Sequence, residues 1–233
     1  TTNDRIVKNM EVCNFDRVVL SVHNMMNQIE ITQGEHESLT IEARPEILSK
    51  ITTTVSGGEL TIGMEGGLLD KLGFALATSL TRPIVQYQLL VKNLACLELA
   101  GFVHANAAEL HAGGLSLKLR GAGEITIGSL TAQHVIADLQ GTGRIQLSGR
   151  VEEQDVSIYG PGLYQALDLK SQRARVSLKG LGRARVWAVD KLEIKVRGLG
   201  QVEVRGRPEI CQDVLPRAPM PAVGHLHNPE RAS

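Results

Sequence analysis

The chain has 233 residues, of which 42% are apolar and 3% aromatic, so it can bury a sizeable core built mainly from aliphatic side chains. Its formal net charge is zero, which excludes binding to nucleic acid or to an anionic membrane through bulk charge alone. Three widely spaced cysteines (Cys13, Cys96 and Cys211) make neither a disulfide framework nor a zinc-ligand pattern, and no run of about 18 apolar residues predicts a transmembrane helix.

The first predicted elements along the chain are irregularly spaced strands. Alternating apolar and polar residues predict them over residues 18–22, 28–32, 38–43, 50–63 and 85–91. Gly34 marks a turn, and Gly57-Gly58 indicates a hairpin. We expect these strands to form irregular first coils and a cap, because the end of a stacked β-structure exposes an unpaired edge that must be covered.

Residues 66–82 interrupt the strand pattern. Their leucines recur at roughly helical spacing, and Gly73 and Pro83 limit the predicted helix. Two interpretations stay open for this insert. It forms a short helix or flap that packs on the body of the protein, or it contacts a membrane or a partner chain.

From residue 96 onward the sequence repeats itself. A glycine pair with one residue between recurs at intervals of 18 to 20 residues, after a single glycine that opens the series; the first positions are Gly101, Gly121, Gly141, Gly160, Gly180 and Gly198. Apolar residues lie two and four positions before and after each corner, which predicts two half-buried strands per repeat. A third apolar position follows in most repeats, at Leu110, Leu130, Val151, Leu169 and Val189.

This periodicity predicts an all-β fold, a parallel β-solenoid with coils of about 20 residues. The glycines would be its corners, where the chain turns sharply with a positive φ at one position. We expect one domain over residues 1–207, with an irregular portion at 12–95 and regular coils at 96–207. The proline-rich residues 208–233 are predicted to be a disordered tail.

Several segments together resemble a known bacterial family. They are "NFDRVVLSV", "QIEITQGEHESLTIEA", "GGELTIG" and the serial "LxGxGxIxI" units, and they cover roughly residues 12–207. This pattern resembles the putative auto-transporter adhesin, head GIN domain family. The resemblance implies a right-handed β-helical fold and a cell-envelope or secreted location behind a leader peptide, which would precede Thr1. It implies no catalytic residues.

No motif predicts a cofactor, a metal or a catalytic group. A dinucleotide loop needs a helix after its glycines, whereas strands such as "EITIG" follow here. His104 and His111, with Glu109 between them, lack the converging third or fourth ligand of a zinc site. The neighbouring acids Glu152, Glu153 and Asp155 are expected to be solvated charges near a corner. We therefore predict a protein that is not an enzyme.

Outward positions beside the corners form the one candidate binding surface. The candidate residues lie in a mildly basic stripe with one tyrosine, at Lys118, Arg120, Tyr159, Lys179, Arg183, Lys195 and Arg197. The stripe either keeps a flat sheet soluble or binds an acidic glycan, polymer or protein. Nucleic acid is a poorer match, because aromatic stacking partners are nearly absent.

Three functions follow from these observations. The first is a non-catalytic envelope or secreted protein that binds a polysaccharide or an envelope protein. The second is a structural module that assembles, as a homo-oligomer, through stacked coil ends or through residues 66–82. The third is a carbohydrate-active enzyme on a solenoid scaffold, which would require two or three carboxylates converging in one groove.

Overall fold

The computed structural model describes residues 5–65, 83–214 and 224–225, and this part is nearly all β-structure. The only helix there is the short α1 (Pro45–Leu48). Thirteen strands belong to one sheet, so the predicted all-β class is confirmed. The sheet is mixed, however, so the predicted parallel β-solenoid is not confirmed for the chain as a whole. Residues 66–82, for which a helix was predicted, lie outside the described residues.

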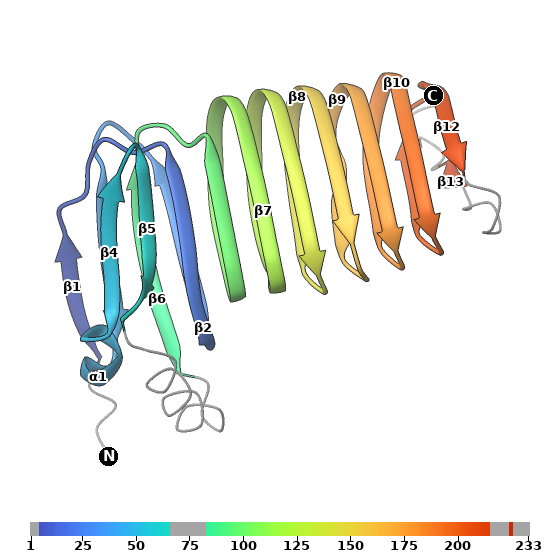
Figure 1. Cartoon of the computed structure of the whole chain (residues 1–233). Helices are drawn as coiled ribbons and strands as arrows, with labels where there is room; N and C mark the ends of the chain where they lie inside the picture. The colour runs from blue at the N-terminus through green and yellow to red at the C-terminus, as the bar shows by residue number, and fades with distance from the viewer. Residues whose placement is uncertain (1–4, 66–82, 215–223, 226–233) are drawn as a thin grey trace, which may run out of the picture.

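The regular half of the chain winds into successive turns that lie side by side (Figure 1). It comprises β7 (Cys96–Gly141), β8 (Arg144–Tyr159), β9 (Leu163–Gly180), β10 (Arg183–Gly198) and β11 (Gln201–Arg205). Each of these strands pairs in parallel with the next. The register brings equivalent repeat positions together, as in the row Leu139, Ile158, Leu178 and Val196.

The first half contains the antiparallel pairs. Its strands are β1 (Ile6–Met10), β2 (Arg17–Gln33), β3 (Ser38–Ala43), β4 (Ile51–Ser56), β5 (Glu59–Met64) and β6 (Ile84–Val91). The strand order is β1-β3-β6-β2-β7, and β3 is antiparallel to both of its neighbours. The predicted hairpin is confirmed as β4 and β5, with positive φ at Gly57 and Gly58. The strands predicted at 18–22 and 28–32 are parts of the single strand β2.

The core consists of aliphatic rows inside the turns. Every apolar residue predicted two and four positions from the glycines is buried. The third predicted row is buried at Leu110, Leu130, Val151 and Leu169, but Val189 is 36% exposed. Pairing between β9 and β10 shifts register between Ala188 and Lys191, in a turn that is two residues shorter than most. Ala188, with 0% exposure, takes the inward position instead.

The corner glycines have the predicted positive φ, at the first position of each pair. Gly121 has φ 117°, and a Cβ built there would lie 2.7 Å from the Gly101 carbonyl oxygen of the preceding turn. The second glycine is needed for another reason. A Cβ at Gly123 would overlap the Val103 carbonyl oxygen of the preceding turn, so a larger residue there would force the turns apart.

Regular structure continues past the predicted boundary at residue 207. Strand β12 (Glu209–Val214) pairs in parallel with β10, and the short β13 (Gly224–His225) pairs with β11. Ile210 packs against the core. The prediction of a disordered tail from residue 208 is therefore wrong for residues 209–214, because they form a strand that adds one more side to the stack of turns.

Candidate functional site

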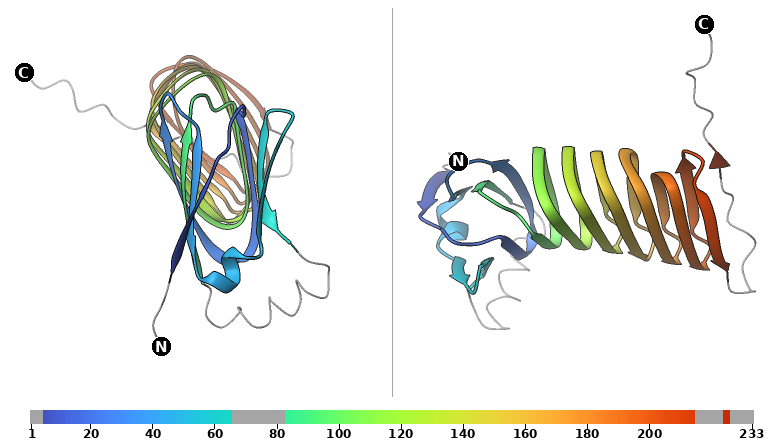
Figure 2. Two further views of the ribbon diagram at one scale, coloured as in Figure 1. Left: turned by 90° about the vertical axis from the view of Figure 1, so that its left-hand side faces the viewer. Right: turned by 90° about the horizontal axis from the view of Figure 1, so that it is seen from above.

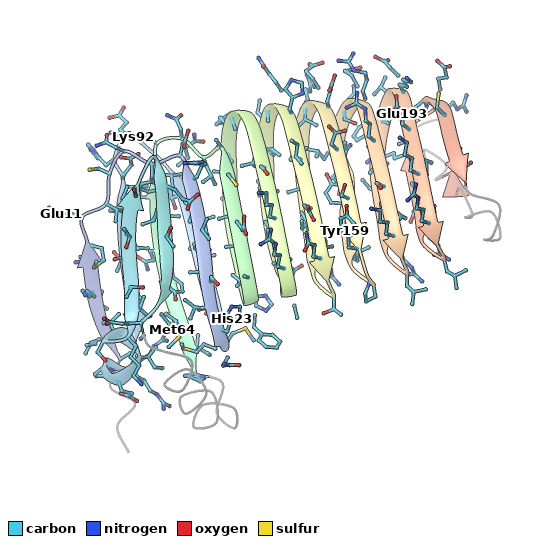
Figure 3. The ribbon with its side chains drawn as sticks, viewed as in Figure 1. Glu11, His23, Met64, Lys92, Tyr159 and Glu193 are labelled. Atoms are coloured by element: carbon cyan, nitrogen blue, oxygen red, sulfur yellow. The ribbon has the colours of Figure 1, made fainter. Side chains whose placement is uncertain are left out.

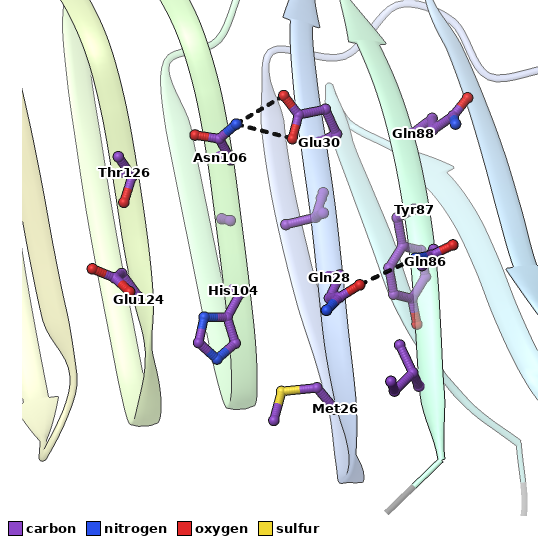
Figure 4. A pocket seen from close by; sticks show the side chains of 13 residues that line it. Met26, Gln28, Glu30, Gln86, Tyr87, Gln88, His104, Asn106, Glu124 and Thr126 are labelled. Carbon is purple, nitrogen blue, oxygen red and sulfur yellow. Dashed lines mark hydrogen bonds between the residues drawn. The ribbon is translucent and has the colours of Figure 1, made fainter.

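Each turn is flattened, so its outward residues lie on two long sides (Figure 2). We call the leading face the side whose strand segments precede the corner glycines, and the trailing face the side whose segments follow them. Figures 1 and 4 view the sheet from opposite sides, since β7 lies to the right of β2 in one and to the left in the other. The predicted stripe lies mainly on the leading face.

Two of the candidate cations on the leading face share one carboxylate. The Nζ of Lys118 lies 3.6 Å from Glu98, and Nη1 of Arg120 lies 2.9 Å from it. Glu98 stands one repeat before Lys118, at the equivalent position. This end of the stripe is therefore partly neutralised, because one carboxylate compensates one of the two positive charges.

The other end of the leading face carries cations without an ion pair in the described part of the chain. The Nζ of Lys179 lies 4.8 Å from the centre of the Tyr159 ring, and Lys179 is aligned with Arg197 on the next strand. Lys195 is aligned with Ser177 on one side and with Asp213 on the other. Figure 3 labels Tyr159 on the outer surface of the regular turns. We call Tyr159, Lys179, Lys195 and Arg197 the basic cluster.

The remaining candidate, Arg183, lies on the trailing face, across the corner from the basic cluster. It is exposed and has no ion pair among the residues described. Its neighbours on that face are paired, since Arg144 lies 3.5 Å from Glu124 and Arg185 lies 2.8 Å from Glu203. The structure thus divides the predicted stripe into three groups and does not bring all seven residues together.

The start of the leading face, where the chain leaves the short third side of the turns, carries a network of ion pairs. Glu153 contacts Arg173 and His134, and Arg175 contacts both Asp155 and Glu193. The hydrogen bond from Arg173 lowers the pKa of Glu153. The acids at 153 and 155 are therefore ion-paired, in contrast to the solvated charges expected from the sequence.

The trailing face contains a groove of about 630 Å³ that crosses β6, β2 and β7 (Figure 4). Amide and carboxylate side chains line it in neighbouring strands. The Nε2 of Gln86 donates to Oε1 of Gln28 at 3.2 Å, and Nδ2 of Asn106 lies 2.9 and 3.0 Å from the two carboxylate oxygens of Glu30. A smaller hollow of about 340 Å³ continues the groove toward the corners, where Phe102 and Pro161 line it.

A buried polar contact lies under this groove. Asn27 has 0% exposure, and its Nδ2 donates to the carbonyls of Val22 at 2.8 Å and Phe102 at 3.2 Å. The hydroxyl of Tyr87 donates to Oδ1 of Asn27 at 3.2 Å. Burial raises the pKa of Tyr87, so the phenol stays protonated and available to donate. Asn27 thus holds the bend of β2 against β6 and β7.

The sequence analysis missed the groove. A signal was present, since polar residues alternate with apolar ones in "NQIE", "VQYQ" and "HAN". However, the three segments become neighbours only through the order β6-β2-β7, which is not the order of the chain. Asn27 also had a signal, because it occupies an inward position between the buried Met25 and Ile29.

Neither a metal centre nor a membrane-spanning helix is found in the residues that the structure describes. No group of three His, Cys, Asp or Glu side chains there could hold a metal ion. No helix in the same residues is both long and apolar enough to cross a bilayer. The three cysteines are free thiols.

Solved structures of bacterial proteins share this fold. A putative adhesin from Bacteroides fragilis matches with a TM-score of 0.78 and 18% identity, over 96% of both chains. A protein from Parabacteroides distasonis described as a putative lipid binding protein matches with a TM-score of 0.68 and 18% identity, over 97% of this chain and 98% of that one. No curated protein matches the sequence. The model of the family described as "Putative auto-transporter adhesin, head GIN domain" matches residues 14–208.

Proposed function

Since the chain belongs to the putative auto-transporter adhesin, head GIN domain family, we propose that it is a non-catalytic protein of the bacterial envelope or a secreted one. It binds an acidic polysaccharide through the outward surface of its turns. In this proposal residues 96–207 form a right-handed parallel β-solenoid within a single domain that spans residues 1–207. The parallel pairing from β7 to β11 and the glycine corners support that description.

The basic cluster is the observation that carries the proposed ligand. Lys179 and Arg197 lie side by side on adjacent strands, about 4.8 Å apart, with no described carboxylate paired to either. Arginine can bind a carboxylate through two parallel hydrogen bonds, and lysine adds a point charge beside it. Tyr159 supplies a ring next to these cations for contact with a sugar. A polymer with regularly spaced carboxylates matches this arrangement.

Polygalacturonate is a suitable probe for this proposal, and calorimetric titration measures its binding. We expect the double variant Lys179→Ala/Arg197→Ala to bind at least about tenfold more weakly, because each hydrogen bond to a charged group contributes roughly 1.5–3 kcal/mol. The matched control is Lys118→Ala/Arg120→Ala, which removes the same charge from the same face but from cations already paired with Glu98.

Two results would contradict the proposed site. One is no binding of polygalacturonate to the unmodified chain at low ionic strength, where electrostatic attraction is least screened. The other is an equal loss of affinity in both double variants. The proposed location has its own test. Antibody detection in fractions of the source cells should place the chain outside the cytoplasm, and recovery from the cytoplasm alone would contradict this.

The enzyme alternative gains no support from the groove. Glu30 and Glu124 both line it, but they belong to strands separated by the first turn of β7, at different positions along the strands. Two strand spacings amount to about 10 Å, beyond the separation of roughly 5–9.5 Å typical of paired glycosidase carboxylates. Each is also engaged elsewhere, Glu30 with Asn106 and Glu124 with Arg144.

Assembly of several copies is a second candidate function, and the edge strand β1 favours it. β1 ends the described strand order, and its residues Ile6 and Val7 are 45% and 60% exposed. An unpaired edge with apolar residues is a template for another strand. The occupant would be a second copy of this chain, paired through β1.

A further inference from the structure

We propose that the groove on the trailing face is a separate binding site for a segment of an uncharged polysaccharide. It lies on the side opposite the basic cluster, and it differs from that cluster in charge. No lysine or arginine is among its lining residues. The inference goes beyond the proposed function, because it concerns another surface and another class of polymer.

The groove presents two parallel rows of polar side chains that run across the strands. Strand pairing aligns Gln86, Gln28 and His104 in one row. It aligns Gln88, Glu30 and Asn106 in the other. Glu124 and Thr126 extend the rows onto the following turn (Figure 4). A linear ligand that crosses the strands would therefore meet a polar group about every 4.8 Å.

Hydrogen bonds within the rows orient these side chains before any ligand arrives. Gln86 donates to Gln28, and Asn106 donates to Glu30. These contacts leave the Nε2 of Gln28, the Oε1 of Gln86 and the Oδ1 of Asn106 without a partner among the described residues. The groove thus offers one free amide donor and two free amide acceptors, and the hydroxyl groups of a sugar can bind both kinds of group. Side chains held in place lose less entropy when they bind.

The charge of the groove selects against anions. Arg144 compensates Glu124, whereas Glu30 accepts only from the neutral amide of Asn106 among the described residues. A carboxylate or phosphate placed here would face Glu30, and the described residues that line the groove include no lysine or arginine. An uncharged ligand avoids this repulsion, and its hydroxyl groups can donate to the carboxylate.

The shape and the apolar rim of the groove complete the match. Ala105 and Ala107 occupy inward positions where the neighbouring strand β2 has Ile29 and Ile31. Ala105 and Ile29 both line the groove, and the side chain on β7 is the smaller of the two. Met26 lines both hollows at the end near the corners and offers an apolar surface for the CH groups of a sugar ring.

Calorimetric titration with cellohexaose and maltohexaose tests the site on the full chain. We expect one of these neutral hexasaccharides to bind, with an affinity that does not change between low and high salt. The double variant Gln28→Ala/Gln86→Ala should bind at least about tenfold more weakly, since each lost hydrogen bond weakens binding roughly fivefold. If this variant fails to fold, Asn106→Ala should show the loss alone.

The matched control is Gln146→Ala/Gln165→Ala, which removes two outward glutamines from the same face outside the groove. We expect it to bind the hexasaccharide as the unmodified chain does. The proposal is overturned if neither hexasaccharide binds at millimolar concentration, or if the control loses as much affinity as the groove variant. Binding of polygalacturonate is independent of both results, so the proposed function can fail or stand separately.

Discussion

Corner glycines are the residues whose role follows most directly from the sequence. Gly121 shows why only glycine is suitable, since its φ of 117° lies in a region that L-residues rarely adopt. A Cβ at Gly121 would also lie too close to the carbonyl oxygen of Gly101 in the preceding turn. A period of about 20 residues was enough to predict this, because the same requirement recurs in each turn.

We expect Gly121→Val to destabilise the fold by at least about 2 kcal/mol, through backbone strain and the clash with the Gly101 carbonyl. Arg120→Ala is the neighbouring control. It removes one exposed ion pair with Glu98, so it should change the free energy of unfolding by less than about 1 kcal/mol. Urea denaturation measures both, and equal stability of Gly121→Val and the unmodified chain would show that the corner assignment is wrong.

The ion pairs between outward residues of neighbouring turns could also have been predicted from the sequence. Glu98 and Lys118, Glu153 and Arg173, and Asp155 and Arg175 each stand one repeat apart. In stacked parallel strands such residues become direct neighbours. The sequence analysis treated the outward cations as a single stripe, because it did not pair them with the acids of the preceding turn.

At the scale of elements, alternation predicted most strands but not how they combine. Strands β3 and β6 and the β4–β5 hairpin coincide with their predicted segments. Strand β2 was predicted as two pieces because Asn24, with φ 63°, interrupts the alternation inside it. The groove depends on placing β2 between β6 and β7, and this order results from long-range pairing that local patterns do not encode.

Buried amides hold neighbouring elements together in two places. Asn27 links β2 to β6 and β7, and Gln154 links β8 to β9 and β10. In both places a buried tyrosine donates to the amide oxygen, from Tyr87 to Asn27 and from Tyr164 to Gln154 at 3.0 Å. The inward polar residue therefore satisfies backbone carbonyls at a bend, where ladder hydrogen bonds are interrupted.

We expect Asn27→Ala to lower the free energy of unfolding by about 1–3 kcal/mol, because it leaves the Val22 and Phe102 carbonyls without the amide that they accept from. Gln88→Ala removes an exposed amide on adjacent β6 and should have an effect under about 0.5 kcal/mol. Chemical denaturation of the two variants provides the comparison. Indistinguishable midpoints would mean that Asn27 does not stabilise the bend.

At the scale of the whole molecule, the repeat predicted the stacked turns but not the ends of the stack. The regular half has a nearly constant period of 18 to 20 residues, so one turn predicts the next. The first half has no period, and there the antiparallel strands β1 and β3 extend the sheet (Figure 2). At the other end β12 continues the side formed by β10, although its composition gave no strand signal.

The two ends of the sheet decide whether copies of the chain can associate. β1 has only five residues, and short edge strands limit pairing with other chains. Its exposed Ile6 and Val7 act in the opposite direction, because apolar side chains favour contact with a second edge. Lys8, between Val7 and Asn9, contributes the only charge within the strand.

If assembly through β1 occurs, the molar mass from light scattering should rise with protein concentration, and Val7→Lys should keep the chain monomeric, because a buried unpaired lysine opposes the contact. Val189→Lys is the control. It makes the same substitution at a position that is 36% exposed but lies in the regular turns, away from the β1 edge. It should associate as the unmodified chain does. A constant monomer mass for the unmodified chain across the concentration range would exclude assembly through this edge and leave polymer binding as the function to test.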